Sequence, residues 1–236
     1  MNRTLVVSFL RQRLTSPLRL VMLGFSFVSP LGMIAFTKQL GMLEGSPAWF
    51  AFILAAGAIG QEVASGVLTL TFARPVTRQA YVLSRWAGAG GFAAALGLAQ
   101  IAVGLMAIAA RGGPLPQGAD VAALVLECVL VSFTASAVMV MLSSFVNGLG
   151  DVALWATGMA IALFATGIAQ VKDWPALARA AQELQLVLIP SLHAGWLFGV
   201  GEPQPFALIS VLSTLAASLA VAVWVVNRKE LSYAAG

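Results

Sequence analysis

The charged side chains that could do chemistry are concentrated in one polar stretch, residues 61–85, which lies between two long apolar runs. The stretch contains the acid Glu62 and three arginines, Arg74, Arg78 and Arg85. Because ionised groups avoid the hydrocarbon core of a bilayer, this stretch is predicted to lie at a membrane surface. Its arginines favour the cytoplasmic surface, where Lys and Arg are enriched in membrane proteins.

A second candidate is Glu127, an acid inside an apolar run. An acid at membrane depth is costly and marks a functional site by default, so Glu127 is a candidate for a substrate pathway. The alternative is that it lies shallow enough to reach water, become protonated or hydrogen-bond a neighbouring helix. Asp151 begins another apolar run and is predicted to cap that helix at its N-terminus.

Catalytic and metal sites are not indicated by the sequence. Cys128 and His193 each stand alone without further ligands at metal spacing, so packing is expected for Cys128 and interfacial anchoring, next to Trp196, for His193. The chain contains neither a His-Glu-x-x-His motif nor a Gly-x-x-x-x-Gly-Lys-Ser/Thr motif. We therefore expect no catalytic residue, no metal site and no ATP-binding site in this chain.

The composition indicates the elements that must position these residues. Hydrophobic residues make up 60% of the chain and charged residues only 9%, whereas soluble domains carry about 25% charged residues. The apolar runs are continuous and close to the roughly 20 residues that a spanning helix needs, which excludes the short alternating segments of a β-barrel. The net charge of +4 therefore reports membrane topology and anionic lipid rather than nucleic acid.

The predicted fold class is an all-α integral membrane protein with a single transmembrane domain over residues 1–236. Six membrane-spanning helices are expected at residues 18–37, 47–62, 86–110, 121–143, 152–169 and 206–226. Residues 1–17 place apolar side chains at helical spacing between arginines, which predicts an amphipathic interfacial helix. Residues 63–85 form a cytoplasmic segment, and residues 171–205 form an outer segment with a half-buried helix that Pro190 interrupts.

The distribution of basic residues orients this arrangement. The segments assigned to the inner side hold nine of the 13 Lys and Arg residues, namely Arg3, Arg11, Arg13, Arg19, Arg74, Arg78, Arg85, Arg228 and Lys229. The positive-inside rule then places both termini in the cytoplasm. We expect a multi-pass protein of the plasma (inner) membrane.

The order of residues in the polar stretch resembles a known pattern. Glu62 is followed by Ser65-Gly66-Val67-Leu68, then by Ala73-Arg74-Pro75-Val76-Thr77-Arg78, and then by Tyr81 and Arg85. This is similar to the first cytoplasmic loop of type-two ABC transporter permeases, which has Glu, Gly-Thr-Leu, an apolar run, a basic-Pro-Val-Ser/Thr-Arg turn and a Tyr. Val67 stands where that family usually has Thr. The six-span layout, the N-terminal segment and the long segment before the last span are also similar.

The resemblance implies a half-transporter that dimerises with a second copy or a paralogue and binds cytosolic ABC ATPase subunits, which would hold ATP and Mg. In that family a coupling helix after the second span docks in a groove of the ATPase. When the roles in that family are transferred to this sequence, Glu62 and Gly66 lie at the end of the second span and in the turn. The residues at or beside the docking surface are then Arg74, Pro75 and Arg78, and Tyr81 and Arg85 follow them.

Elementary geometry is compatible with such a role for the polar stretch. Pro75 excludes a continuous helix through Arg74, and Arg78 and Arg85, about two turns apart, can share a face toward a partner or lipid headgroups. The alternatives are that the arginines only contact lipid phosphate, and that Glu62 caps a helix or pairs with a nearby Arg.

The expected function is the permease subunit of an ABC exporter that moves a hydrophobic or amphiphilic substrate outward. Its expected partners are the ATPase, a second permease chain and membrane lipid, and not nucleic acid. A non-transporting scaffold and a secondary transporter remain alternatives. A membrane-embedded enzyme is disfavoured because paired acids, or a Ser nucleophile with its base, are not found in the apolar runs.

Overall fold

The computed structural model describes residues 3–73 and 75–229. All regular elements in these ranges are helices. In chain order they are α1 (Arg3–Leu14), α2 (Pro17–Thr37), the 3-10 helix η1 (Leu40–Leu43), α3 (Ser46–Ala55), α4 (Gly60–Ala64), α5 (Val67–Phe72), α6 (Arg78–Ala110), α7 (Gly118–Phe145), α8 (Gly150–Lys172), α9 (Pro175–Leu188), the 3-10 helix η2 (Gly195–Phe198) and α10 (Pro205–Arg228).

Within the described ranges, six helical segments are long and apolar enough to cross a membrane. They are α2, the stretch Leu40–Ala64 that contains η1, α3 and α4, and the helices α6, α7, α8 and α10. The prediction of an all-α chain with six apolar spans is therefore confirmed, and the fold is that of a multi-pass membrane protein.

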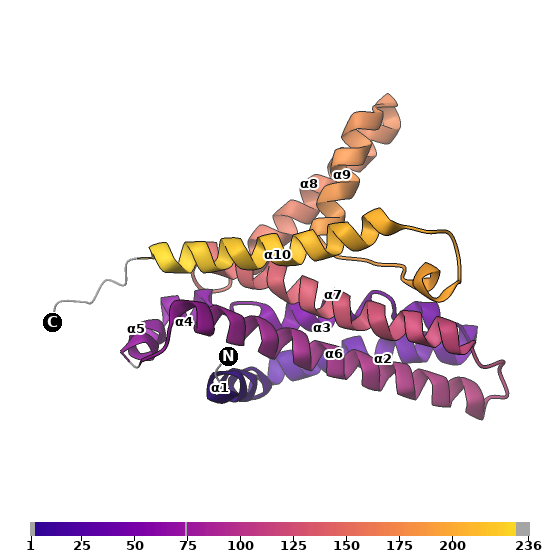
Figure 1. Ribbon diagram of the computed structural model, residues 1–236, viewed down its shortest axis with the longest axis horizontal. Coiled ribbons are helices and arrows are strands. Elements are labelled where there is room, and N and C mark those ends of the chain that lie inside the picture. Colours follow the sequence, from indigo (N-terminus) through magenta and orange to yellow (C-terminus); the bar gives the residue numbers. More distant parts are fainter. Residues whose placement is uncertain (1–2, 74, 230–236) are drawn as a thin grey trace.

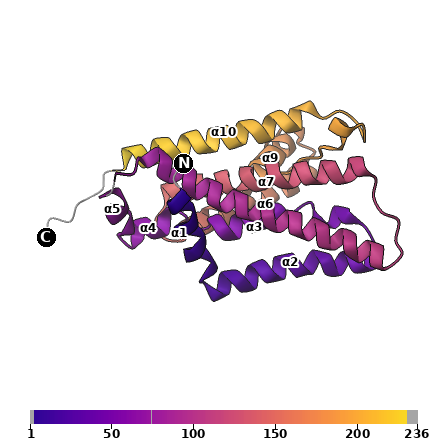
Figure 2. The same cartoon turned by 60° about the horizontal axis from the view of Figure 1, so that its bottom comes forward.

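Four of the long helices, α2, α6, α7 and α10, run along the longest axis of the molecule (Figure 1). The helix α1 is turned sharply away from α2 (Figure 2), at the point where Pro17 begins α2. The helices α8 and α9 project sideways from the bundle as an antiparallel hairpin (Figure 1). Trp155 Nε1 and Gln185 Nε2 join the hairpin by donating to Leu188 O at 3.0 Å and to Thr166 Oγ1 at 3.1 Å.

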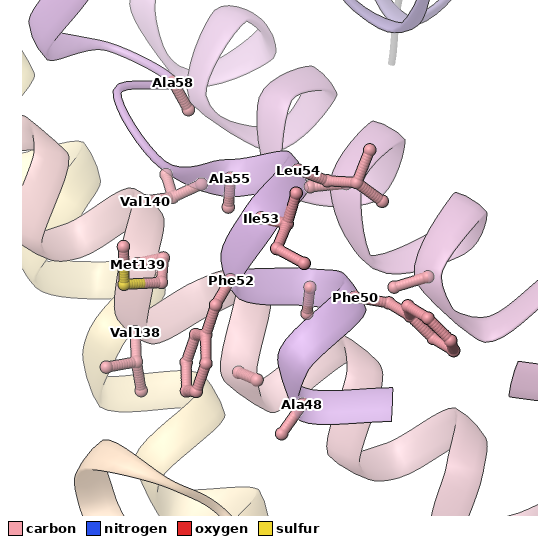
Figure 3. Packing of buried hydrophobic residues seen from close by; sticks show 14 of the residues in the cluster. Ala48, Phe50, Phe52, Ile53, Leu54, Ala55, Ala58, Val138, Met139 and Val140 are labelled. Atoms are coloured by element: carbon pink, nitrogen blue, oxygen red, sulfur yellow. The ribbon is translucent and has the colours of Figure 1, made fainter. Parts of the chain in front are cut away.

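The core is built around α3, which is mostly apolar and in which every residue except Trp49 is buried. Phe50 and Leu54 are completely buried, and Phe52 is only 6% exposed. Figure 3 shows Val138 and Met139 of α7 next to this helix, which α6 also contacts. The second span is thus the central element of the bundle.

A side chain from another helix replaces the backbone hydrogen bond that a proline removes from the first span. Pro30 lies inside α2 and has no N–H to donate to the carbonyl of Ser26, four residues earlier. Gln100 of α6 is fully buried and donates from Nε2 to Ser26 O at 3.2 Å and to Phe27 O at 2.7 Å. The helix therefore continues through the proline.

The structure differs from the predicted bounds on both sides of the polar stretch. The second span is interrupted at residues 56–59, between α3 and α4, where Gly57 has a φ of +68°. The third helix begins at Arg78 rather than at Trp86, because Thr77 caps it by accepting the Ala80 N–H at 3.2 Å. The segment between the second and third spans is therefore shorter than residues 63–85, and its last residues are helical.

Candidate functional site

A buried cluster of three polar side chains joins the end of the second span to the start of the third. Arg85 Nη2 lies 2.7 Å from Glu62 Oε1 and 2.9 Å from Glu62 Oε2. Tyr81 donates its hydroxyl to Glu62 Oε2 at 2.6 Å. Tyr81 is fully buried, and the side chains of Glu62 and Arg85 are only 2% and 5% exposed. One carboxylate thus accepts from two donors away from water.

The sequence places the donors of this cluster on one face of α6, because Tyr81 and Arg85 are four residues apart. The guanidinium of Arg85 also lies over two aromatic rings, 5.0 Å from the centroid of Phe9 and 4.8 Å from that of Tyr81. Phe9 belongs to α1, so the cluster connects α1, α4 and α6. Glu62 therefore pairs with a nearby arginine, which was one of its two alternative roles.

The break in the second span is held by side chains from other helices. Gly57 N donates to Asp151 Oδ2 at 2.5 Å, and Ser143 Oγ accepts from Ile59 N at 3.0 Å and from Gly60 N at 2.9 Å. Buried backbone groups that lack a partner cost free energy, so these acceptors stabilise the non-helical residues 56–59 inside the bundle. The prediction that Asp151 caps its helix is wrong, because the N-cap of α8 is Leu149; Asp151 lies in the first turn and accepts from the break instead.

Two arginines near the N-terminus hold the carbonyl side of the same break. Arg13 Nη1 and Arg19 Nη2 donate to Ala56 O at 2.8 and 3.2 Å, and both also reach Gln61 Oε1, at 3.0 and 3.1 Å. Burial, and next the charge of Arg19, lower the pKa of Arg13 to about 9. Arg13 is therefore still a cation at neutral pH and ties α1 to the central span.

Arg78 also makes internal contacts. Its Nη1 donates to the carbonyl oxygens of Val226, Asn227 and Lys229 at 2.9, 2.7 and 3.0 Å. These acceptors end α10, where a cation is favoured by the helix dipole. The structure thus does not place Arg78 and Arg85 on one outward face, because Arg85 points inward to Glu62 and Arg78 points to the end of α10.

The remaining residues of the predicted docking surface surround α5. Gly66 has a φ of +72° and makes the turn between α4 and α5. Pro75 is exposed between α5 and α6, and Arg74 lies outside the described residues. Leu70 of α5 is 70% exposed. This helix lies at the same end of the bundle as the end of α10 (Figure 1).

Glu127 lies near the opposite end of the bundle. Its Oε1 accepts the backbone N–H of Ala194, which belongs to the segment between α9 and η2. A cavity of about 320 Å³ adjoins it, lined in part by Glu44 and His193. His193 Nε2 lies 3.5 Å from Glu44 Oε2, and the two side chains are 66% and 49% exposed. Among the described residues no group of three or more His, Cys, Asp or Glu side chains could hold a metal.

The polar side chains that stabilise the break in the second span were not predicted from the sequence. The spacing of Arg13 was compatible with an inward position, because it follows Phe9 by four residues and both are buried on one face of α1. Ser143 and Gln61 carried no signal of this role, since their partners depend on how distant helices pack. The sequence matches no protein-family model and no curated protein.

Proposed function

We propose that this chain is the transmembrane permease subunit of an ATP-driven ABC exporter. In this proposal it dimerises in the plasma membrane, couples to separate cytosolic ATPase subunits, and moves a hydrophobic or amphiphilic substrate outward. The observation that carries the proposal is the buried cluster of Glu62, Tyr81 and Arg85, which we call the clamp. It joins the two ends of the segment that resembles a coupling loop.

The clamp offers a physical route for transmitting force. The helix α5 and its flanking turns connect α4 to α6, and the Glu62–Arg85 ion pair joins α4 directly to α6. A load on α5 would therefore move the second and third spans together instead of unfolding the segment. The second span is the most buried of the six candidates, so its displacement would be passed to the helices that pack around it.

The partner-facing part of the segment is then α5 with the turn that follows it, and not Arg85. Leu70 is the large apolar side chain of α5 that is most exposed. We assign the coupling helix to α5, the docking surface to Leu70, Arg74 and Pro75, and the amphipathic interfacial helix to α1. Arg78 would set the position of the docking surface relative to α10.

The break in the second span could instead suggest a secondary transporter, in which interrupted helices bind ions or substrate with their free backbone groups. Here Asp151 and Ser143 already occupy the amide groups of the break, and Arg13 and Arg19 occupy a carbonyl. The break is therefore closed by the protein itself, which favours a structural role.

The proposal is tested by purifying the tagged chain from its native membrane in mild detergent, identifying bound chains by mass spectrometry and measuring vanadate-sensitive ATPase activity. Leu70→Asp and Arg74→Glu should each release the ATPase or uncouple it. The matched control is Leu115→Asp, which alters a leucine that is 62% exposed in the loop at the other end of the bundle and should change neither result. If the wild type never carries an ATPase, the permease assignment fails and a scaffold is the better account.

A further inference from the structure

A cavity of about 560 Å³ lies between α2 and the start of α3, away from the clamp and from Glu127. Its walls are mainly apolar and include Phe25 and Trp49. Three serines also line it, Ser26 and Ser29 from α2 and Ser46 from α3. The volume lies within the range of about 300–1,000 Å³ that is typical of small-molecule sites.

None of the three serine hydroxyls forms a hydrogen bond with a described residue, and Ser46 is only 5% exposed. Several hydroxyls of other spans are instead satisfied within their own helix; for example, Thr134 Oγ1 donates to Leu130 O at 2.8 Å, and Thr166 Oγ1 donates to Ala162 O at 2.9 Å. A polar group without a partner is costly where water is scarce. Three such groups in one cavity indicate a ligand that supplies hydrogen-bonding atoms.

The charge and opening of the cavity restrict the ligand further. No charged side chain lines it. An ionised ligand would lose its water there and gain no counter-charge, so a neutral ligand is favoured. Phe25 is 74% exposed at the side of the bundle, where lipid lies in a membrane-spanning arrangement. A ligand can therefore enter from the bilayer with an apolar portion.

We propose that this cavity binds an uncharged amphiphile, with its hydroxyl or carbonyl headgroup on the hydroxyls of Ser26, Ser29 and Ser46 and its apolar body against Phe25 and Trp49. Binding from the bilayer follows from the cavity alone. That the bound molecule is exported cargo rests on the proposed function.

The test uses the full chain in phosphatidylcholine nanodiscs and a brominated monoacylglycerol as the probe, because bromine quenches tryptophan fluorescence on contact. The probe should quench the wild type saturably, and Trp49→Phe should remove that component. Replacing all three serines by alanine should weaken binding roughly tenfold or more, since each lost hydrogen bond costs about 1 kcal/mol. Ser213→Ala is the control, because this exposed hydroxyl already donates to Ser210 O at 3.0 Å, and it should bind as the wild type does.

Three results would overturn the site: equal affinity in the triple serine variant, equal binding of a brominated trimethylammonium analogue, or equal saturable quenching by brominated phosphatidylcholine, which would indicate general lipid contact. The cargo assignment has its own measurement. If the probe is bound as expected but does not stimulate the vanadate-sensitive ATPase activity of the co-purified complex, the site stands and the cargo assignment fails. If the wild type never carries an ATPase, the permease proposal fails, and the quenching result is unaffected.

Discussion

Replacing Glu62 by methionine is the sharpest perturbation of the clamp. The change removes the carboxylate that faces Arg85 Nη2 at 2.7 Å and the Tyr81 hydroxyl at 2.6 Å, and it leaves a side chain of similar length. Arg85 then keeps its charge in a site where its side chain is only 5% exposed. Its Nε and Nη1 already lack a hydrogen-bond partner among the described residues, so no second acceptor is already in place for the guanidinium.

The expected loss follows from the burial of the pair. Removing one partner of a buried ion pair costs about 3–5 kcal/mol, because the other charge stays buried without compensation. Replacing both partners by apolar groups costs much less, since no charge remains to be desolvated. Glu62→Met should therefore lose about 3–5 kcal/mol, and Glu62→Met/Arg85→Met should be more stable than Glu62→Met alone although it carries one more substitution.

The assay is reversible unfolding in mixed micelles with increasing SDS, followed by far-UV circular dichroism. Glu44→Met is the matched control, because Glu44 is half exposed and lies 3.5 Å from His193, and such surface pairs contribute about 0–1 kcal/mol. The reasoning is refuted if Glu62→Met unfolds within about 1 kcal/mol of the control. It is also refuted if the double variant is no more stable than Glu62→Met.

Three further predictions concern close packing and helix ends. Gly97→Ala should destabilise the protein by about 1–3 kcal/mol, because the new Cβ would lie 2.4 Å from Cys128 Sγ. Adding Cys128→Ala should restore most of the lost melting temperature, and a double variant without this rescue would contradict the contact. Gly60→Ala should be still less stable, since its Cβ would lie 2.6 and 2.7 Å from two backbone carbonyl oxygens. Gly91→Ala, whose Cβ would have nothing within 4 Å, should leave stability unchanged or raise it. Similar losses of stability in both variants would refute the steric argument. Arg78→Gln should accelerate hydrogen exchange in the last turn of α10 and spare the middle of α6, and unchanged exchange would show that Arg78 does not hold this end.

Some of the site followed from local sequence alone. Glu62 and the basic residues after it mark the end of the second span, because charges terminate apolar runs whatever the fold. Gly66 and Pro75 mark turns for equally local reasons. The polar stretch was therefore recognisable, but the inward position of Arg85 was not, since a pattern of spacing does not say which neighbour an α6 side chain faces.

Hydropathy and helical period determined the six apolar spans and the all-α class, because each depends on residues within about 20 positions of one another. The tertiary structure alone decided which polar groups meet. Gly57 pairs with Asp151 across 94 residues, and Arg78 reaches Val226 across 148. A buried polar group must find a partner in whichever helix packs beside it, so its role is settled only when the helices come together.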